Sequence, residues 1–300
     1  MFRLDGRVAV VTGACGKLGP VWTRALAGAG ARVAGLDLAG VHPPTALEDL
    51  LGREAGDVKL YPADVTDRRS LDRAREAVEA DFGPVSILVN NAGIDQPPGA
   101  TVRTYRIEEI PSELCRKVLE VNVLGLFLAT QAFIPSFRRA GRASVVNIGS
   151  LYGEVSPDER LYNHIPADPP FLKPPMYGAS KSAVSSLTRY LATHLAREKV
   201  RVNTLLPGGV LGAQDDVSVF GHEAHELGEA PHDGVDARVD VGVVVLERGA
   251  QQRPRAVMEE LRALVEVSRV VLVALDDERR ALARCPQAER LAAAAIGQQR

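Results

Sequence analysis

The sequence predicts an α/β protein with a doubly wound parallel sheet that is flanked by helices. Short apolar runs rich in β-branched residues alternate with helix-length amphipathic segments along most of the chain. Strands buried on both faces of a parallel sheet read as such continuous apolar runs, and right-handed crossovers between them give one sheet. A glycine-rich turn after the first run, opening the first helix, is typical of the same fold class.

The composition is that of an ordinary soluble protein. Hydrophobic residues make up 46% and charged residues 25% of the 300 residues, which suits one large domain or one domain with an appendage. The formal net charge of −2 gives no reason to expect nucleic acid or an acidic membrane surface as a partner. The chain shows no apolar leader and no run of about 18 apolar residues, so neither export nor membrane anchorage is expected.

The cysteines Cys15, Cys115 and Cys285 are few and far apart. This spacing indicates reduced thiols in a cytoplasmic protein rather than a disulfide framework. Cys15 falls in the glycine-rich turn, where an inert, buried side chain is favoured over an accessible thiol.

The first strand and the turn after it predict a nucleotide site. Residues 7–12 form the apolar run, and the turn from Gly13 to Gly19 leads into a helical pattern through Trp22 and Leu26. Glycines let the backbone approach a pyrophosphate, and the free N–H groups at the helix start favour its charge. Glycines also serve ordinary tight turns, but this position between strand and helix favours nucleotide binding.

The second strand, 32–37, ends in Asp37, about twenty residues beyond the turn. A carboxylate there accepts hydrogen bonds from the hydroxyl groups of an adenosine ribose and repels a 2′-phosphate. This favours NAD over NADP. Lys17 in the turn could partly offset the charge, but Asp37 lies where the ribose is expected.

Residues 58–62 predict a third strand, and a helix follows over about 68–81 with Thr66 or Asp67 as its cap. Asp64 lies between the two elements and could also be a simple turn residue.

Residues 86–93 predict a fourth strand that ends in a polar turn at the ligand-facing edge of the sheet. A long helix follows over about 112–139, and Asn122 interrupts its apolar pattern. A buried asparagine needs partners, so a structural hydrogen bond and a catalytic water site are both open. The fifth strand, 143–148, brings Ser150 to the same edge.

Tyr177 and Lys181 lie four residues apart in a helix that extends to about Glu198, so they share one face. A neighbouring ammonium group favours the phenolate and can lower a tyrosine pKa from about 10 by roughly 1–3. The phenol then becomes usable as a proton donor and acceptor near neutral pH. A sixth strand, 201–206, follows this helix.

Together these motifs resemble the short-chain dehydrogenase/reductase superfamily over roughly residues 1–214. The resemblance implies a Rossmann-like fold for this region and leaves 215–300 as a divergent, helix-rich C-terminal segment. The matching elements, in order, are Thr12-Gly13 to Gly19, Asp64-Val65, Asn90-Asn91-Ala92-Gly93, Asn122, Ser150, Tyr177 with Lys181, and Pro207-Gly208.

The resemblance implies catalytic roles for four residues. Tyr177 would exchange a proton with the substrate oxygen while hydride passes to or from the nicotinamide. Ser150 would hydrogen-bond that oxygen, and Lys181 would bind the nicotinamide ribose and hold the pKa of Tyr177 down. Asn122 would anchor a water that connects Lys181 to solvent.

Cofactor contacts are implied in the same way. Asp64 and Val65 would contact the adenine, Asn91 the nearby ribose, and the backbone of Val210 the nicotinamide carboxamide. NAD is the expected cofactor, NADP is less favoured, and no metal is expected. The expected cofactor-binding residues are Gly13, Gly16, Leu18, Gly19, Asp37, Asp64, Val65, Asn91, Tyr177, Lys181 and Val210.

The expected activity is the interconversion of an alcohol and a ketone or aldehyde on a small molecule by hydride transfer. The spacing of Gly13, Gly16 and Gly19 is similar to that of sugar-nucleotide epimerases and dehydratases of the extended branch, which use NAD transiently. Such an enzyme is one alternative, and a catalytically weak NAD-binding regulatory protein is another. The turn 90–93 and the ending 202–208 favour the single-domain branch.

The resemblance implies a homodimer or homotetramer. The helix near 112–139 and the helix after Tyr177 are expected to pack between subunits.

Ser150 and Tyr177 are 27 residues apart, about twice the usual gap of the single-domain branch. The inserted segment, 151–176, joins two catalytic elements and is therefore expected over the mouth of the pocket. A lid or substrate-recognition loop is favoured over an inert surface loop. The residues in it that could touch substrate are Asp158, Tyr162 and His164.

The family pattern is lost after about Gln214. Residues 254–268 and 277–296 look helical, and 270–275 look like a strand that could supply a seventh strand by another route. A divergent extension and a reading-frame change are both open. The histidines within 222–226 are three residues apart, so a solvated polar loop is favoured over a metal site.

Overall fold

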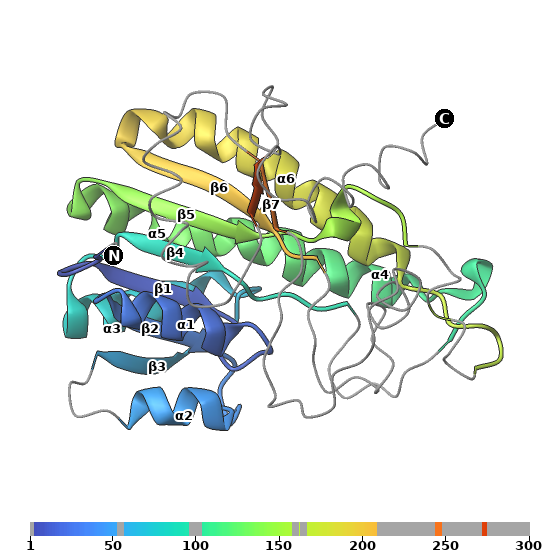
Figure 1. Ribbon diagram of the computed structural model, residues 1–300, viewed down its shortest axis with the longest axis horizontal. Coiled ribbons are helices and arrows are strands. Elements are labelled where there is room, and N and C mark those ends of the chain that lie inside the picture. Colours follow the sequence, from blue (N-terminus) through green and yellow to red (C-terminus); the bar gives the residue numbers. More distant parts are fainter. Residues whose placement is uncertain are drawn as a thin grey trace, which may run out of the picture.

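The computed structural model describes residues 3–52, 57–95, 104–157, 162 and 167–208, together with the backbone of 244–247 and 272–274. The described strands form one sheet in the order β3-β2-β1-β4-β5-β6-β7-β8 (Figure 1). Their bounds are β1 Val8–Thr12, β2 Arg32–Asp37, β3 Val58–Pro62, β4 Ile87–Asn90, β5 Ala143–Ile148, β6 Val200–Leu206, β7 Val244–Glu247 and β8 Leu272–Ala274.

The first six strands are parallel, as the sequence predicts. Strand β1 pairs with β2 on one side and with β4 on the other, so the strand order reverses next to β1. In open α/β sheets, ligands bind in the crevice beyond the carboxyl ends of the strands at such a reversal. The topology therefore points to the glycine-rich turn after β1 as the binding edge.

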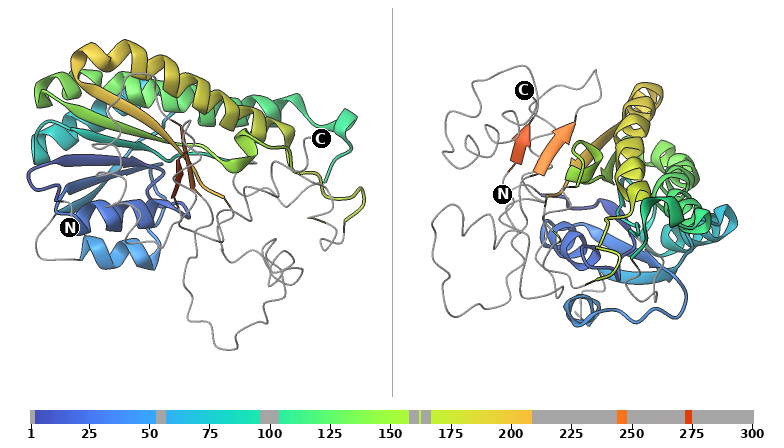
Figure 2. Two further views of the ribbon diagram at one scale, coloured as in Figure 1. Left: turned by 45° about the horizontal axis from the view of Figure 1, so that its top comes forward. Right: turned by 90° about the vertical axis from the view of Figure 1, so that its right-hand side faces the viewer.

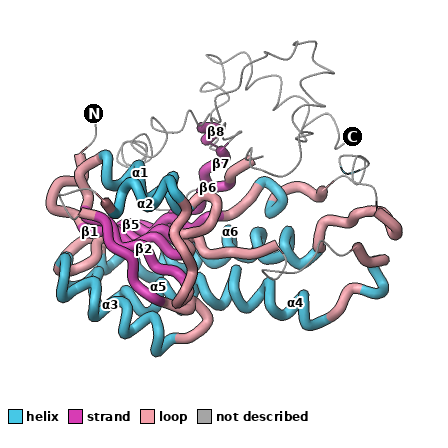
Figure 3. Tube along the Cα trace, turned by 90° about the horizontal axis from the view of Figure 1, so that it is seen from below, coloured by secondary structure: helices cyan, strands magenta, loops and turns pink. Residues whose placement is uncertain are grey.

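Helices cover both faces of the sheet (Figure 2, Figure 3), and an apolar core lies between the sheet and the helices on each face. On one face, α1 and α2 bury Trp22, Leu26, Leu47 and Leu50. The helices α3, α5 and α6 cover the other face through side chains such as Phe133. The helix bounds are α1 Gly19–Gly28, α2 Thr45–Leu51, α3 Arg68–Phe82, α4 Ser112–Leu119, α5 Leu126–Ala140 and α6 Pro175–Leu195.

Short helical turns complete the described elements. Three are 3₁₀ turns, namely η1 Ile107–Glu109, η3 Leu151–Gly153 and η5 Ala196–Glu198, the last of which continues α6 to its predicted end. Helix α2 has no counterpart among the predicted elements. It is a short helix held by Leu47 and Leu50, too brief for a clear periodic signal.

The single helix predicted over about 112–139 is divided into three parts. A π-helical turn, η2 Glu120–Gly125, separates α4 from α5 and contains Asn122. Single π turns inside α-helices are frequent at functional sites. The break in the apolar pattern at Asn122 thus marks a real change in helix geometry.

The segment Ser112–Ala140 is long and apolar enough to cross a membrane by length and composition. In this fold its α5 part packs on the sheet, where Ala129, Ala132, Phe133 and Phe137 are completely buried. An apolar core helix passes the same length and composition test, so the segment is explained by its packing.

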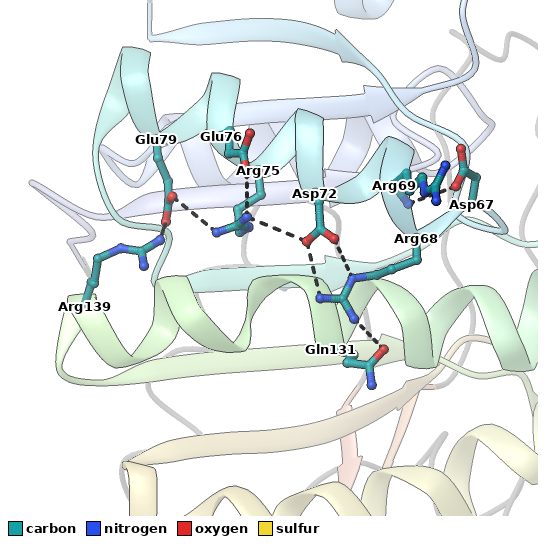
Figure 4. Close-up of polar contacts among 9 residues, drawn as sticks. All are labelled: Asp67, Arg68, Arg69, Asp72, Arg75, Glu76, Glu79, Gln131 and Arg139. Carbon is teal, nitrogen blue, oxygen red and sulfur yellow. Dashed lines mark hydrogen bonds and ion pairs between the residues drawn. The ribbon is translucent and has the colours of Figure 1, made fainter.

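Ion pairs and hydrogen bonds fasten α3 to α5 along their exposed edge (Figure 4). Arg68 Nη1 donates to Gln131 Oε1 at 2.6 Å, and Arg139 pairs with Glu79. Arg75 lies between the carboxylates of Asp72, Glu76 and Glu79 on α3. A more exposed pair such as Arg68–Asp72 contributes only about 0–1 kcal/mol, whereas Arg75 and Glu79 are largely buried within the network.

The C-terminal edge of the sheet departs from the parallel arrangement. Strand β7 pairs antiparallel with β6, and β8 pairs parallel with β7. The strand predicted over 270–275 is present as Leu272–Ala274, but it is the outermost strand, and β7 between it and β6 was not predicted. The predicted helices 254–268 and 277–296 lie outside the described residues.

A row of buried polar side chains crosses the middle of the sheet on the α5 and α6 side. Asn90 Nδ2 donates to Asn147 Oδ1 at 2.8 Å and to Thr130 Oγ1 at 2.9 Å. Asn147 Nδ2 donates to Thr188 Oγ1 at 2.8 Å, and Thr204 Oγ1 donates to the same hydroxyl at 2.6 Å. Since these residues come from β4, β5, β6, α5 and α6, the row joins the elements that carry the candidate site.

Candidate active site

The glycine-rich turn lies at the binding edge and is packed against the turn after β4. Gly13 has φ +62°, and a Cβ there would come within 2.8 Å of Ala92 Cα. A Cβ on Gly19 would meet the Ala14 carbonyl oxygen at 2.2 Å. Gly16 is exposed, and Leu18 forms the N-terminal boundary of α1. The N–H groups of Ala14, Cys15 and Gly16 are bonded within the protein, so anion binding by this turn remains a prediction.

Asn91 holds this turn against β4. Its Nδ2 donates to the carbonyl oxygens of Thr12 at 3.0 Å and Gly13 at 2.9 Å, and its Oδ1 accepts from Trp22 Nε1 at 2.9 Å. Thr12 Oγ1 accepts in return from the backbone N–H groups of Asn91 and Ala92. The side chain of Asn91 is thus committed to positioning the loop, and its contact with the ribose remains a prediction.

Asp37 lies at the end of β2, beside the turn. Its Oδ2 accepts the Cys15 N–H at 2.7 Å, and its Oδ1 accepts the Leu38 N–H at 2.9 Å. A carboxylate offers about four acceptor positions, and the Cys15 thiol also hydrogen-bonds Asp37, so about one remains for a ligand hydroxyl group. Burial, together with the Asp37 charge, raises the pKa of the Cys15 thiol to about 11. The thiol is therefore inert as predicted, but the side chain is only partly buried. Lys17 is exposed.

Asp64 forms a local turn after β3. Its Oδ1 accepts from the N–H and hydroxyl groups of Thr66 at 2.8 and 2.7 Å. Asp67 caps α3 by accepting from the Arg69 N–H at 2.9 Å, as predicted for this position. Val65 packs against the π turn, where a Cβ on Gly125 would meet Val65 Cγ2 at 2.8 Å. The turn role of Asp64 is observed, and its contact with adenine remains a prediction.

Asn122 connects the turn after β4 to the helix of Tyr177 and Lys181. Its Oδ1 accepts the Ile94 N–H at 2.8 Å, and its Nδ2 donates to the Ile94 carbonyl at 2.8 Å and to Ser180 Oγ at 2.9 Å. The side chain is only 2% exposed. The structural alternative is thus observed, and the water site stays a prediction.

Ser150, Tyr177 and Lys181 come together at the ends of β5 and α6. Tyr177 lies in the first turn of α6 and is hydrogen-bonded by Ser150, which also accepts the Tyr152 N–H at 3.2 Å. Lys181 Nζ lies 5.7 Å from the centroid of the Tyr177 ring and donates to the Ile148 carbonyl at 2.8 Å. The structure therefore brings the three residues together, and their catalytic roles remain predictions.

The proton affinities at this site differ from the prediction. Burial raises the pKa of Tyr177 above its usual value, although the Ser150 hydrogen bond and the Lys173 charge act in the opposite direction. Lys181 is buried, and this lowers its pKa to about 8. The expected lowering of the Tyr177 pKa by Lys181 was therefore wrong for the protein without cofactor, because burial has the larger effect.

The described part of the inserted segment lies against Tyr177. Lys173 Nζ is 5.1 Å from the centroid of the Tyr177 ring and 2.9 Å from Asp95 Oδ2. Tyr162 shares a 2.8 Å hydrogen bond with Tyr152 through their hydroxyl groups. Tyr162 is thus near the site, as predicted, whereas Asp158 and His164 lie outside the described residues.

Lys173, Asp95 and Tyr152 were not predicted as site residues. A signal for Lys173 was present, since it precedes Tyr177 by the same four residues by which Lys181 follows it. Because the helix begins only at Pro175, this spacing is not a helical repeat, and the contact depends on the path of the inserted segment.

A small and largely apolar pocket with a volume of about 30 Å³ opens next to Asp95. It lies between α4 and the chain that leads into α6. Its lining residues are Asp95, Tyr105, Ile110, Leu114, Cys115, Val118, Leu172, Pro174, Pro175 and Met176.

Some predicted site residues cannot be placed. Val210 and the cluster 222–226 lie outside the described residues. Within the described part of the chain, no group of three or more His, Cys, Asp or Glu side chains is arranged to hold a metal ion.

Comparison with known proteins identifies relatives over most of the chain. Residues 14–229 match a protein family described as enoyl-(acyl carrier protein) reductase. A D-threitol dehydrogenase of Mycolicibacterium smegmatis is 34% identical over 223 residues, covering 74% of this chain and 75% of that protein. A galactitol 2-dehydrogenase (L-tagatose-forming) of Cereibacter sphaeroides is 38% identical over 210 residues, covering 70% and 74%.

Solved structures agree with these relatives. An NAD⁺-bound xylitol dehydrogenase has a TM-score of 0.55 and 29% identity, covering 68% of this chain and 70% of that one. A gluconate 5-dehydrogenase of Burkholderia cenocepacia in complex with NADP and tartrate has a TM-score of 0.57 and 28% identity, covering 69% and 72%. Similar folds thus bind either nicotinamide cofactor.

Proposed function

Since the chain belongs to the short-chain dehydrogenase/reductase superfamily and is an NAD(P)-dependent oxidoreductase that interconverts an alcohol with a ketone or aldehyde, we propose that it oxidises a small polyol and prefers NAD. The relatives named for threitol and galactitol support the substrate class. Polar groups beside Tyr177, namely the hydroxyls of Tyr152 and Tyr162 and the Lys173–Asp95 pair, suit a molecule with several hydroxyl groups.

The residues of the site divide the chemistry between them. The nicotinamide, when bound, supplies the hydride acceptor. Tyr177 takes the proton from the substrate hydroxyl in oxidation and returns it in reduction, while Ser150 holds the substrate oxygen beside the phenol. Lys181, fixed by the Ile148 carbonyl, would bind the nicotinamide ribose. The amine of Lys181 is buried, whereas Tyr177 is partly exposed and can meet a substrate hydroxyl.

Asp37 is the observation that carries the cofactor preference. Its carboxylate accepts the Cys15 N–H of the glycine-rich turn, and a negative charge beside this turn supports the proposal because it would repel a 2′-phosphate. The acceptor position that the Cys15 and Leu38 bonds leave on the carboxylate suits a ribose hydroxyl group.

The Asp37→Asn variant tests this preference. The amide oxygen can accept the Cys15 N–H, but the amide nitrogen cannot accept the Leu38 N–H, so the variant loses the charge and one backbone hydrogen bond. A charge-assisted hydrogen bond contributes about 1.5–3 kcal/mol, so the ratio of kcat/KM for NAD to that for NADP should fall about 10- to 100-fold. A ratio unchanged by the substitution, or a wild-type enzyme that prefers NADP, would refute the assignment.

The substrate class is tested by cofactor reduction with threitol, arabinitol, xylitol and galactitol, each with NAD and NADP. Stoichiometric NADH formation supports the proposal. Oxidation of a simple secondary alcohol with no turnover of any polyol would contradict the substrate class. Turnover of a sugar nucleotide without net NADH would instead identify the epimerase activity.

We also propose a homodimer or homotetramer that acts in the cytoplasm. Leu119 and Leu124, at the π turn, and Tyr190 on α6 are exposed although large and apolar. These elements are the ones expected to pack between subunits. Light scattering coupled to gel filtration tests the assembly, and a monomer at micromolar concentration would refute it.

A further inference from the structure

Two lysines, not one, lie beside the ring of Tyr177. Lys173 Nζ is 5.1 Å from the ring centroid, and Lys181 Nζ is 5.7 Å from it. Both distances are within the range of a cation–π contact, about 6 Å. Lys173 comes from the inserted segment, whereas Lys181 comes from the same helix as Tyr177.

The two lysines differ in their surroundings. Lys181 is 6% exposed and donates to the Ile148 carbonyl, so its burial opposes a positive charge. The side chain of Lys173 is 18% exposed and pairs with Asp95, whose side chain is 42% exposed. Lys173 therefore reaches Tyr177 as part of an ion pair, whereas Lys181 reaches it from a buried position bonded to a backbone carbonyl.

We propose that Lys173 is the positioning residue that favours the phenolate of Tyr177, and that Asp95 moderates this effect by pairing with Lys173. The inference rests on Tyr177 being the acid and base of the proposed function. It gives the inserted segment an electrostatic role in the reaction, in addition to any role in substrate binding.

Several charged or titratable groups of the described elements face Tyr177 and affect its pKa. Lys173 and Tyr162 come from the inserted segment, Asp95 from the chain after β4, Tyr152 from η3 and Lys181 from α6. Among them, the positive charge of Lys173 lowers the pKa of Tyr177, and the charges of Asp95 and Tyr152 raise it. The pair at Lys173 and Asp95 thus acts on Tyr177 with opposite signs.

These opposite signs separate an electrostatic role from a structural one. The experiment compares Lys173→Met, Asp95→Asn, the double variant and Lys173→Arg by the pH profile of kcat/KM for alcohol oxidation. Lys173→Met should move the acidic limb to higher pH by about one unit, since an opposite charge at this distance lowers a pKa by about 1–3 when fully effective. Asp95→Asn should move the limb to lower pH.

The double variant and Lys173→Arg give further outcomes. The acidic limb of the double variant should lie between those of the two single variants, and Lys173→Arg should retain the wild-type pH profile. Lys59→Met is a matched control, because Lys59 pairs with Asp81 at the same Nζ–Oδ2 distance of 2.9 Å on β3 and α3. It should leave the limb in place.

A second readout does not depend on the substrate. Tyrosinate absorbance is titrated for each variant, with and without NAD, and the signal of its Tyr177→Phe counterpart is subtracted. If no alcohol is oxidised, the proposed function fails, while this titration still decides the role of Lys173. The proposal would be overturned if the acidic limb and the Tyr177 titration shift in the same direction in both single variants, or do not shift. The Lys173–Asp95 pair would then have a structural role only.

Discussion

Replacing Gly13 with alanine should weaken both the fold and the cofactor site. Gly13 has φ +62°, a left-handed conformation that costs an alanine about 1–2 kcal/mol. The added Cβ would lie 2.8 Å from Ala92 Cα and 3.1 Å from Ala92 N. Because both are backbone atoms that cannot rotate away, the overlap should add about 1–3 kcal/mol. The free energy of unfolding should therefore fall by about 2–5 kcal/mol.

Part of this strain should appear as weaker binding. If the turn shifts away from Ala92, the backbone groups that face a pyrophosphate shift with it, and each 1.4 kcal/mol lost raises Kd about tenfold. We expect the Kd for NADH to rise about tenfold or more. Urea unfolding gives the stability term, and quenching of protein fluorescence by NADH gives the affinity.

Gly141 supplies the matched control. It has φ +73° at the C-terminus of α5, and a Cβ there would meet nothing within 4 Å. In Gly141→Ala the free energy of unfolding should therefore fall only by the cost of the left-handed conformation, about 1–2 kcal/mol, and the Kd for NADH should be unchanged. Equal destabilisation of the two variants, with NADH affinity retained in both, would refute the steric argument at Ala92.

Three further predictions address the site. Tyr177→Phe should lower kcat by about 100- to 10,000-fold and leave the Kd for NADH nearly unchanged, and full activity would remove Tyr177 from the mechanism. Asn122→Asp faces the Ile94 carbonyl with an acceptor and loses the donor to Ser180, so urea unfolding should show a loss of about 2–4 kcal/mol, against about 1 kcal/mol for Ser180→Ala. Lys181 has a pKa of about 8 in the folded protein against 10.5 for the free side chain, so the unfolded chain holds this proton more tightly between those values. The free energy of unfolding should therefore rise with pH across that window by at most about 3 kcal/mol, and Lys181→Met should lose this rise when denaturation is compared at the two ends of the window.

The sequence predicts the elements whose signal is local. The parallel strands are continuous apolar runs, and the glycine-rich turn and Asp37 occupy fixed positions relative to the first two of them. The division of the helix at Asn122 can also be read from the sequence, because a polar amide interrupts the apolar face. The π geometry of this turn cannot be read from the sequence, because it depends on how the amide bonds the backbone of Ile94.

The residues that were missed depend on contacts between distant segments. Asp95, from the chain after β4, pairs with Lys173 across 78 positions of sequence, and the contact of Lys173 with Tyr177 is made just before α6 begins rather than within the helix. The direction of the Tyr177 pKa was wrong for a related reason, since spacing reveals a neighbouring charge but not the degree of burial. Similarly, the antiparallel β7 has no motif that sets its direction.

The buried polar row through Asn90, Asn147 and Thr204 has a consequence for how the sheet is assembled. These residues stand opposite one another in the strand pairings, and their side chains point to one face. Sliding β5 by one residue would turn Asn147 to the opposite face, because side chains alternate along a strand. Its amide would then be left in an apolar layer without Asn90 or Thr188, at a cost of about 1–3 kcal/mol for each unmade bond. The row therefore destabilises sheets in which the strands pair in a shifted register. Such a shift would also separate Ser150 from Tyr177.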